Sequence, residues 1–204
     1  AQLYEQGAGG KLNRKEQTDF KLYADFEDVV SLLFDADKDG DLDIYVGAGG
    51  NNMPPGSRES QHRLYKNDGR GNFSIDVKSF PNNDMNTAVA VNYDYDGDGD
   101  EDLYVGSRSV PQHYGTSPQS YVYNNDGQGH FTDVMAQLNQ ELAYAGMITG
   151  AEWADVLGGK EKELIITGEW MTTRIYSYNK TTKKLEEQKT TGLEELYGWW
   201  QTIE

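Results

Sequence analysis

Short runs of apolar residues recur along this chain, and each run has the length of a β-strand. The runs at 28–34 and 87–93 are rich enough in apolar and β-branched residues to be buried on both faces, and the run at 148–154 occupies the same place in a third unit. Each run leads into a loop, and a second aliphatic run follows the loop. The pattern therefore predicts three equivalent pairs of strands.

A second repeated pattern predicts a hairpin after each pair. The segments LYKNDGRGNF at 64–73 and VYNNDGQGHF at 122–131 each read as a strand, a turn with two glycines and another strand. Weaker copies are found at 3–12 and 174–185. The tyrosines of the two clear copies, Tyr65 and Tyr123, are 123 − 65 = 58 residues apart.

A period near 60 residues with four antiparallel strands in each unit is the pattern of a β-propeller blade. We therefore expect an all-β fold, a partial propeller of about three and a half blades in a single repeat domain, 1–204. A seven-bladed propeller would need about twice this length, so we expect an excised segment, or one that closes by pairing its ends or another copy. The segment 132–143 reads either as a short helix between blades or as a strand and a loop.

The expected units follow the repeats. They are an outer hairpin and linker at 1–27, a blade with an acidic loop at 28–85, a second such blade at 86–145, a blade with a degenerate loop at 146–197 and the start of a further blade at 198–204.

The acidic loops are the strongest chemical signal. DADKDGDLD at 35–43 and DYDGDGDED at 94–102 carry aspartates at every second position around a glycine. So many carboxylates repel one another unless a hard cation lies among them, and Ca²⁺ suits them because it takes six to eight oxygen ligands. A solvated acidic turn without metal is the alternative, which two matching copies disfavour.

An EF-hand does not fit these loops. Its twelfth position is a bidentate Glu, where this chain has Val46 and Val105, and β-rich runs follow both loops where a helix is required. The third unit keeps Asp155 and Glu163 at the first and ninth positions, but Leu157 and Gly159 replace two acids. We expect no ion there, and two calcium ions in all.

Composition excludes several classes of function. The net charge is −16, with 34 acidic and 18 basic residues, so neither nucleic acid nor an anionic membrane is an expected partner. There are no cysteines, which excludes disulfides and thiolate sites. No apolar run approaches the ~18 residues of a membrane span, so membrane insertion is not expected. Calcium loops favour an extracellular or cell-surface location, in a bacterium as a secreted or outer-membrane-associated protein.

At these residues the chain resembles the integrin-type FG-GAP repeat family, also described as VCBS repeats. The apolar strand, the D-x-D-x-D-G-x-x-D loop and the aliphatic strand ending in glycine lie at 29–47 and 88–106. The Y-x-N-D-G-x-G-x-F hairpin and the long connections resemble bacterial relatives of cartilage acidic protein.

The resemblance implies a calcium-containing propeller with one ion in each intact loop. One ion would take the side chains of Asp35, Asp37, Asp39 and Asp43 and the carbonyl of Asp41. The other would take the side chains of Asp94, Asp96, Asp98 and Asp102 and the carbonyl of Asp100. Calcium is then a structural clamp, and function is sought elsewhere.

The connections at 47–62 and 106–120 are the better candidates for ligand recognition, although plain surface loops are the alternative. Each combines Arg, His and Pro, and the second adds Tyr114, a set that can bind carboxylates or sugars. Among the tryptophans, we expect Trp153 in the core, Trp199 and Trp200 between blades, and Trp170 in an exposed connection.

Catalysis has little support in the sequence. His62, His113 and His130 do not occupy equivalent repeat positions or match a metal-ligand spacing. The hypotheses are a calcium-stabilised propeller segment for adhesion or for binding protein or carbohydrate, part of a propeller-based polysaccharide-active enzyme such as a lyase, or a structural spacer. Exposed strand edges also predict possible self-association.

Overall fold

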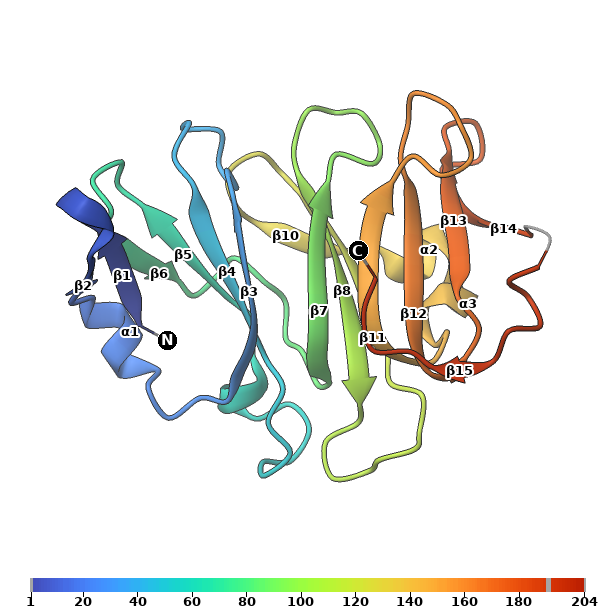
Figure 1. Cartoon of the computed structure of the whole chain (residues 1–204), viewed down its shortest axis with the longest axis horizontal. Coiled ribbons are helices and arrows are strands. Elements are labelled where there is room, and N and C mark those ends of the chain that lie inside the picture. Colours follow the sequence, from blue (N-terminus) through green and yellow to red (C-terminus); the bar gives the residue numbers. More distant parts are fainter. Residues whose placement is uncertain (1, 190–191, 204) are drawn as a thin grey trace.

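In the computed structural model, which describes residues 2–189 and 192–203, the three predicted pairs of strands extend into three antiparallel sheets (Figure 1). Each sheet contains four strands that are neighbours in the sequence and in space. The first has the order β3 (Asp28–Phe34), β4 (Asp43–Ala48), β5 (Arg63–Asn67), β6 (Phe73–Asp76). The second has the order β7 (Asn86–Tyr93), β8 (Asp102–Ser109), β9 (Tyr121–Asn125), β10 (Phe131–Asp133).

The third sheet repeats this order and gains a short strand. It contains β11 (Met147–Ala154), β12 (Glu163–Met171), β13 (Arg174–Asn179) and β14 (Lys184–Gln188). The added strand β15 (Gly198–Trp199) pairs with β12. A separate hairpin of β1 (Leu3–Gln6) and β2 (Leu12–Lys15) precedes the first sheet. The predicted all-β class with four-stranded antiparallel units is thus confirmed, and the described residues form no closed barrel.

The core lies between neighbouring sheets, and β8 shows why its sequence is apolar on both faces. Leu103 and Val105 belong to a buried cluster with Phe34 and Tyr45 of the first sheet. Tyr104, between them, belongs to a second cluster that includes Leu164 of the third sheet. Successive side chains of a strand point to opposite faces, so a strand between two other sheets must be apolar at every position.

Helices are few and short. The segment predicted as either helix or strand and loop divides between β10 and two single-turn helices, α2 (Met135–Leu138) and α3 (Gln140–Ala143). The sequence analysis missed α1 (Thr18–Leu22), which is too short for a 3.6-residue pattern to be seen. Its Phe20 packs edge-on against Tyr65, with ring centroids 4.7 Å apart. Two 3₁₀ turns complete the structure, η1 (Ala8–Gly10) and η2 (Arg58–Ser60).

The predicted unit boundaries stay a prediction. The segment assigned to a further blade contributes β15 to the third sheet, and Thr202 and Ile203 approach Gly150 of β11. Trp153 is buried as predicted, at 3 % exposure. Trp199 and Trp200 are 54 % and 40 % exposed in this chain, and their packing between blades stays a prediction.

Candidate cation sites and the opposite edge

The acidic loops lie together at one edge of the sheets. They connect β3 to β4 and β7 to β8, and the degenerate loop connects β11 to β12 (Figure 1, upper edge). The longer connections from β4 to β5 and from β8 to β9 lie at the opposite, lower edge. The repeat therefore separates the carboxylate-rich loops from the segments predicted to recognise a ligand.

Each intact loop gathers three carboxylates. In the first loop one oxygen from each of Asp35, Asp37 and Asp39 lies within 4.8 Å of the others. In the second loop Asp94, Asp96 and Asp102 do the same. Such clusters can hold a metal ion, because carboxylate oxygens at this spacing can share one hard cation.

The structure does not bring every predicted ligand into these clusters. Asp43 is outside the first and Asp98 is outside the second. Asp41 and Asp100, predicted to ligate through their carbonyls, point their side chains at the glycines of the neighbouring hairpin turns, Gly69 and Gly127. These four assignments stay predictions.

The turn itself is built by backbone donors that bind the first acid. Gly40 N donates to Asp35 Oδ2 and Gly99 N donates to Asp94 Oδ2, both at 3.0 Å. Gly40 and Gly99 each have φ of 91°, a conformation that glycine adopts without steric cost. The equivalent hydrogen bonds show that the two loops share one fold.

The last acid of each loop is buried and anchors the loop to the sheet. Asp43 accepts hydrogen bonds from Ala36 N at 3.0 Å and Asn67 N at 2.8 Å. Asp102 accepts from Asn125 N at 3.0 Å. Burial raises the pKa of Asp43, and burial raises the pKa of Asp102 to about 8. Both carboxyls therefore lie where a charge is disfavoured unless a cation or further donors compensate it.

Unpartnered carboxylate oxygens support a cation at both loops. Asp35 Oδ1, Asp37 Oδ1 and Asp102 Oδ2 are buried and have no hydrogen-bond partner among the described residues. Buried carboxylate oxygens normally have a donor or a metal as partner. The residues present thus fit a bound cation, which would stabilise the ionised side chains of both clusters.

Lys38 is a residue whose role the sequence analysis missed. It occupies the fourth position of the first loop, has a φ of 61° and forms an ion pair with Asp100 of the second loop. This hydrogen bond raises the pKa of Lys38. Lys66 of β5 lies 3.3 Å from Asp37 and donates to the carbonyl of Gln128 at 2.6 Å. Basic side chains therefore connect neighbouring loops, a tertiary relation that a single repeat does not reveal.

The third loop keeps its turn with fewer acids. Val156 N and Leu157 N donate to Glu163 Oε2 at 3.0 and 3.3 Å, and Gly158 N donates to Asp155 Oδ1 at 3.0 Å. Among the described residues no cation cluster forms there.

At the lower edge, a cleft of about 490 Å³ lies among the three sheets, and both predicted recognition connections contribute to it. Asn51 comes from the first connection, and Arg108, Ser109 and Tyr114 come from the second. The two connections touch where Gln112 N donates to Asn51 Oδ1 at 2.6 Å. The structure therefore joins the two segments that the sequence suggested separately.

The histidines of these connections do not act together. His62 is buried, and its Nδ1 lies 2.9 Å from the Tyr45 hydroxyl. Burial lowers the pKa of His62 to about 3, so it is neutral at physiological pH. His113 is exposed and in the other connection. The buried His62 is a core residue rather than an accessible ligand-binding one.

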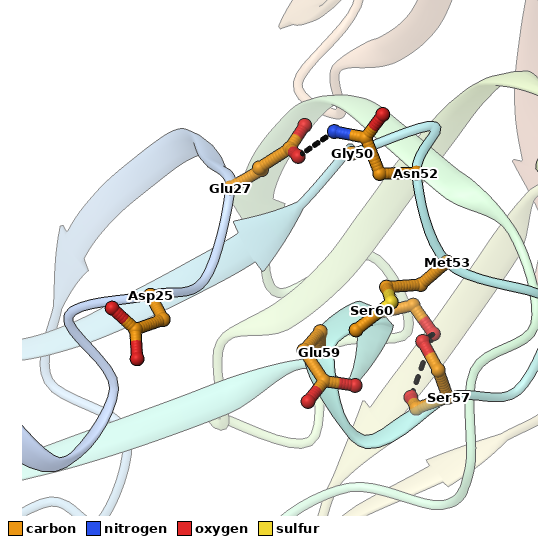
Figure 2. A pocket seen from close by; sticks show the side chains of 8 residues that line it. All are labelled: Asp25, Glu27, Gly50, Asn52, Met53, Ser57, Glu59 and Ser60. Carbon is orange, nitrogen blue, oxygen red and sulfur yellow. Dashed lines mark hydrogen bonds between the residues drawn. The ribbon is translucent and has the colours of Figure 1, made fainter.

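A smaller pocket lies beside the first connection and is lined by acids (Figure 2). Asp25, Glu27 and Glu59 line it together with Met53, and Asn52 Nδ2 donates to Glu27 Oε1 at 2.5 Å. Its volume is about 100 Å³. Ligand pockets for small molecules usually hold about 300–1,000 Å³, so this one is too small for more than a few waters.

Part of the chain matches a known protein family. Residues 35–105 match a family described as FG-GAP-like repeat, and this span runs from the first acidic loop through the second. The match is consistent with the FG-GAP/VCBS repeat family and confirms that resemblance for the matched residues. A repeat of this kind suggests a β-propeller-type domain. A search of curated proteins found no match. In the described residues, no helix is long and apolar enough to cross a membrane.

Proposed function

We propose that this chain is a β-propeller-type segment that binds two calcium ions in its acidic loops and recognises a ligand at the opposite edge. The observation that carries the proposal is the pair of carboxylate clusters with buried, unpartnered oxygens. Calcium suits them because it accepts six to eight oxygen ligands in flexible geometry, whereas Mg²⁺ demands a stricter octahedron.

Calcium has a structural role in this proposal. The two carboxylate clusters lie in loops at one edge of the sheets. Lys38 and Lys66 link these loops to neighbouring segments. A cation that neutralises the carboxylates would favour the folded loops over the unfolded chain, since an ion bound only to the native state stabilises it. An extracellular or cell-surface location follows, because calcium is abundant there.

Binding is favoured over catalysis by the character of the lower edge. Tyr114, Trp170 and Trp199 form an exposed aromatic group, with ring centroids 5.9 and 5.3 Å apart in succession. Tyr114 donates a hydrogen bond to Glu169, and this bond raises the pKa of the phenol. A lyase that used tyrosine as its base would need the pKa lowered towards neutrality. We therefore place this chain among binding modules rather than enzymes.

Isothermal titration of the metal-free protein with CaCl₂ tests the proposal. We expect two ions per chain and weaker binding of Mg²⁺. A stoichiometry of zero, or equal affinity for Mg²⁺, would contradict it. An Asp35→Ala and Asp94→Ala double variant serves as the control and should give no calcium heat.

A further inference from the structure

The lower edge carries a cleft and an aromatic surface that share residues. Tyr114 lines the cleft of about 490 Å³ and also packs edge-on against Trp170. Trp170 in turn packs against Trp199, and Gln201, two residues later, lines the cleft. We call this combined surface the aromatic cleft. Its volume lies within the range of small-molecule sites.

Three aromatic side chains of the aromatic cleft are exposed although they pack against one another in succession. Tyr114, Trp170 and Trp199 are 55 %, 57 % and 54 % exposed. Large aromatic side chains are normally buried, and an exposed group of them marks an interaction site. Their apolar faces and polar edges suit a ligand that presents both kinds of surface.

Trp170 is held in a conformation that its side chain disfavours. Its φ is 56°, in the left-handed region that bulky residues rarely adopt. Strained backbone of this kind is found preferentially at ligand-binding sites. Glycine or asparagine would fit this position of β12 with less strain, so the indole has a use other than stabilising the chain.

The polar part of the aromatic cleft is nearly uncharged. Among the described residues that line it, Arg108 is the one charged side chain. Its Nε and Nη2 donate to Glu169 Oε1 at 3.0 and 2.6 Å, and Tyr114 donates to the other oxygen. Glu169 is only 2 % exposed. The buried carboxylate therefore compensates the arginine, and little positive charge remains to attract an anionic ligand.

Amides and hydroxyls supply the remaining hydrogen-bonding groups. They come from the second and third sheets, from the connection after β4 and from the segment after β15: Asn51, Asn86, Thr87, Ser109, Thr149 and Gln201. Asn86 Oδ1 is buried and has no hydrogen-bond partner among the described residues, whereas its Nδ2 donates to Ser109 Oγ at 3.0 Å. Amides and hydroxyls both donate and accept, which matches a ligand rich in hydroxyl groups.

We infer that the aromatic cleft binds a neutral oligosaccharide, with sugar rings stacked on Trp170 and Trp199 and hydroxyls bonded to the amide, hydroxyl and Arg108–Glu169 groups. Sugar rings present apolar C–H faces and polar hydroxyl edges, which are the two surfaces found here. This inference rests on the proposed role of the chain as a binding module and names its ligand class.

The test uses the whole chain, a panel of neutral oligosaccharides and the tryptophan fluorescence of the protein. The panel covers α- and β-linked hexoses, N-acetylhexosamines and deoxyhexoses, and uronic-acid oligomers and a mixed peptide library form the comparison arms. We expect at least one neutral oligosaccharide to bind with a dissociation constant of about 1 mM or tighter. Binding by uronic-acid oligomers alone, by peptides alone or by nothing in the panel would overturn the inference.

The decisive variant is Trp170→Gly. It removes the indole and relieves the positive φ, so we expect at least tenfold weaker sugar binding with a melting temperature that is unchanged or higher. Tyr4→Ala is the matched control, since Tyr4 is also exposed but lies on β1. Unchanged sugar binding by Trp170→Gly, or equal weakening by Tyr4→Ala, would contradict the assignment.

Measurements with calcium and with a chelator separate the two proposals. If the protein binds a sugar but shows no response to calcium, the inference about the aromatic cleft is supported and the proposed calcium sites are rejected. A calcium response without sugar binding would do the opposite.

Discussion

The first two acidic loops share a turn that the third loop keeps only in part, because Gly40 and Gly99 have a φ of 91° at the sixth position whereas Lys160 at that position has no positive φ. All three connect the first two strands of a sheet, and in the first and third the last acid accepts a backbone N–H from the residue after the first acid. Asp43 has this role in the first loop and Glu163 in the third. The last acid is therefore part of the turn, whether or not a metal binds.

What differs is the acids at the third and fifth positions. Asp37 and Asp39 complete a carboxylate cluster, whereas Leu157 and Gly159 leave Asp155 and Glu163 satisfied by backbone donors. Asp39 and Asp98 each accept a backbone N–H within the turn, at 2.9 and 3.0 Å, but the mutual repulsion of the extra carboxylates opposes the turn. Their value lies in binding a cation, so calcium dependence should follow the first two loops alone.

The largest expected effect is that of calcium on the whole protein. An ion at 100 times its dissociation constant stabilises the native state by about 2.7 kcal/mol, so two sites should contribute about 5 kcal/mol. For a chain of this size we expect the melting temperature to rise by about 10 °C or more when calcium replaces a chelator. Scanning calorimetry in both buffers measures the shift. An identical melting temperature in the two buffers would contradict the proposal that the first two loops bind calcium.

Removing one site should halve that response. Asp94→Ala deletes a carboxylate of the second cluster, so we expect calcium titration to give one ion instead of two and to lose about 2.7 kcal/mol of calcium-dependent stability. Asp155→Ala, at the same position of the third loop, is the matched control. It should leave the stoichiometry at two, and a fall there would show that the third loop also binds an ion.

The pH dependence of the metal-free protein tests the buried last acid of the second loop. Burial raises the pKa of Asp102 from its ordinary value of 3.8 to about 8, so between these values the native state keeps a proton that the unfolded chain releases. Stability should therefore fall as pH rises from about 4 to 8, and the melting temperature should fall with it. Bound calcium favours the carboxylate and should flatten this dependence.

Asp102→Asn tests the source of this slope. The amide oxygen can still accept from Asn125 N, but it cannot titrate, so the metal-free protein should lose most of its pH dependence. If the dependence of stability on pH persists unchanged in this variant, other titratable groups cause it.

The smallest effect concerns Lys38. Its ion pair with Asp100 links the two intact loops at a half-exposed position, where solvent screens the attraction. We expect Lys38→Ala to lower the melting temperature of the metal-free protein only slightly, an effect that 1 M salt removes. Lys160→Ala, in the third loop, should have no salt-dependent effect. A loss of calcium stoichiometry in Lys38→Ala would instead make Lys38 part of the site.

The sequence by itself determined the repeat, because strands and turns depend on local patterns. A strand packed between two other sheets, such as 103–105, must be apolar on both faces, the turn at Gly99 needs a positive φ, and the aspartates of the loop lie within nine residues. Each of these constraints is satisfied inside one unit, so each can be read from one unit.

Only the tertiary structure decided which side chains meet across units. The single-turn helix α1 is stabilised by Phe20 against Tyr65, and Lys38 meets Asp100 only when neighbouring sheets pack. Likewise, Glu169 joins Arg108 from another sheet to form the aromatic cleft. These contacts link residues about 40 to 60 positions apart, and no local pattern encodes them. The acidic loops could be predicted from the sequence because their ligands lie within nine residues. The aromatic cleft could not, because its residues meet only when the sheets pack against one another.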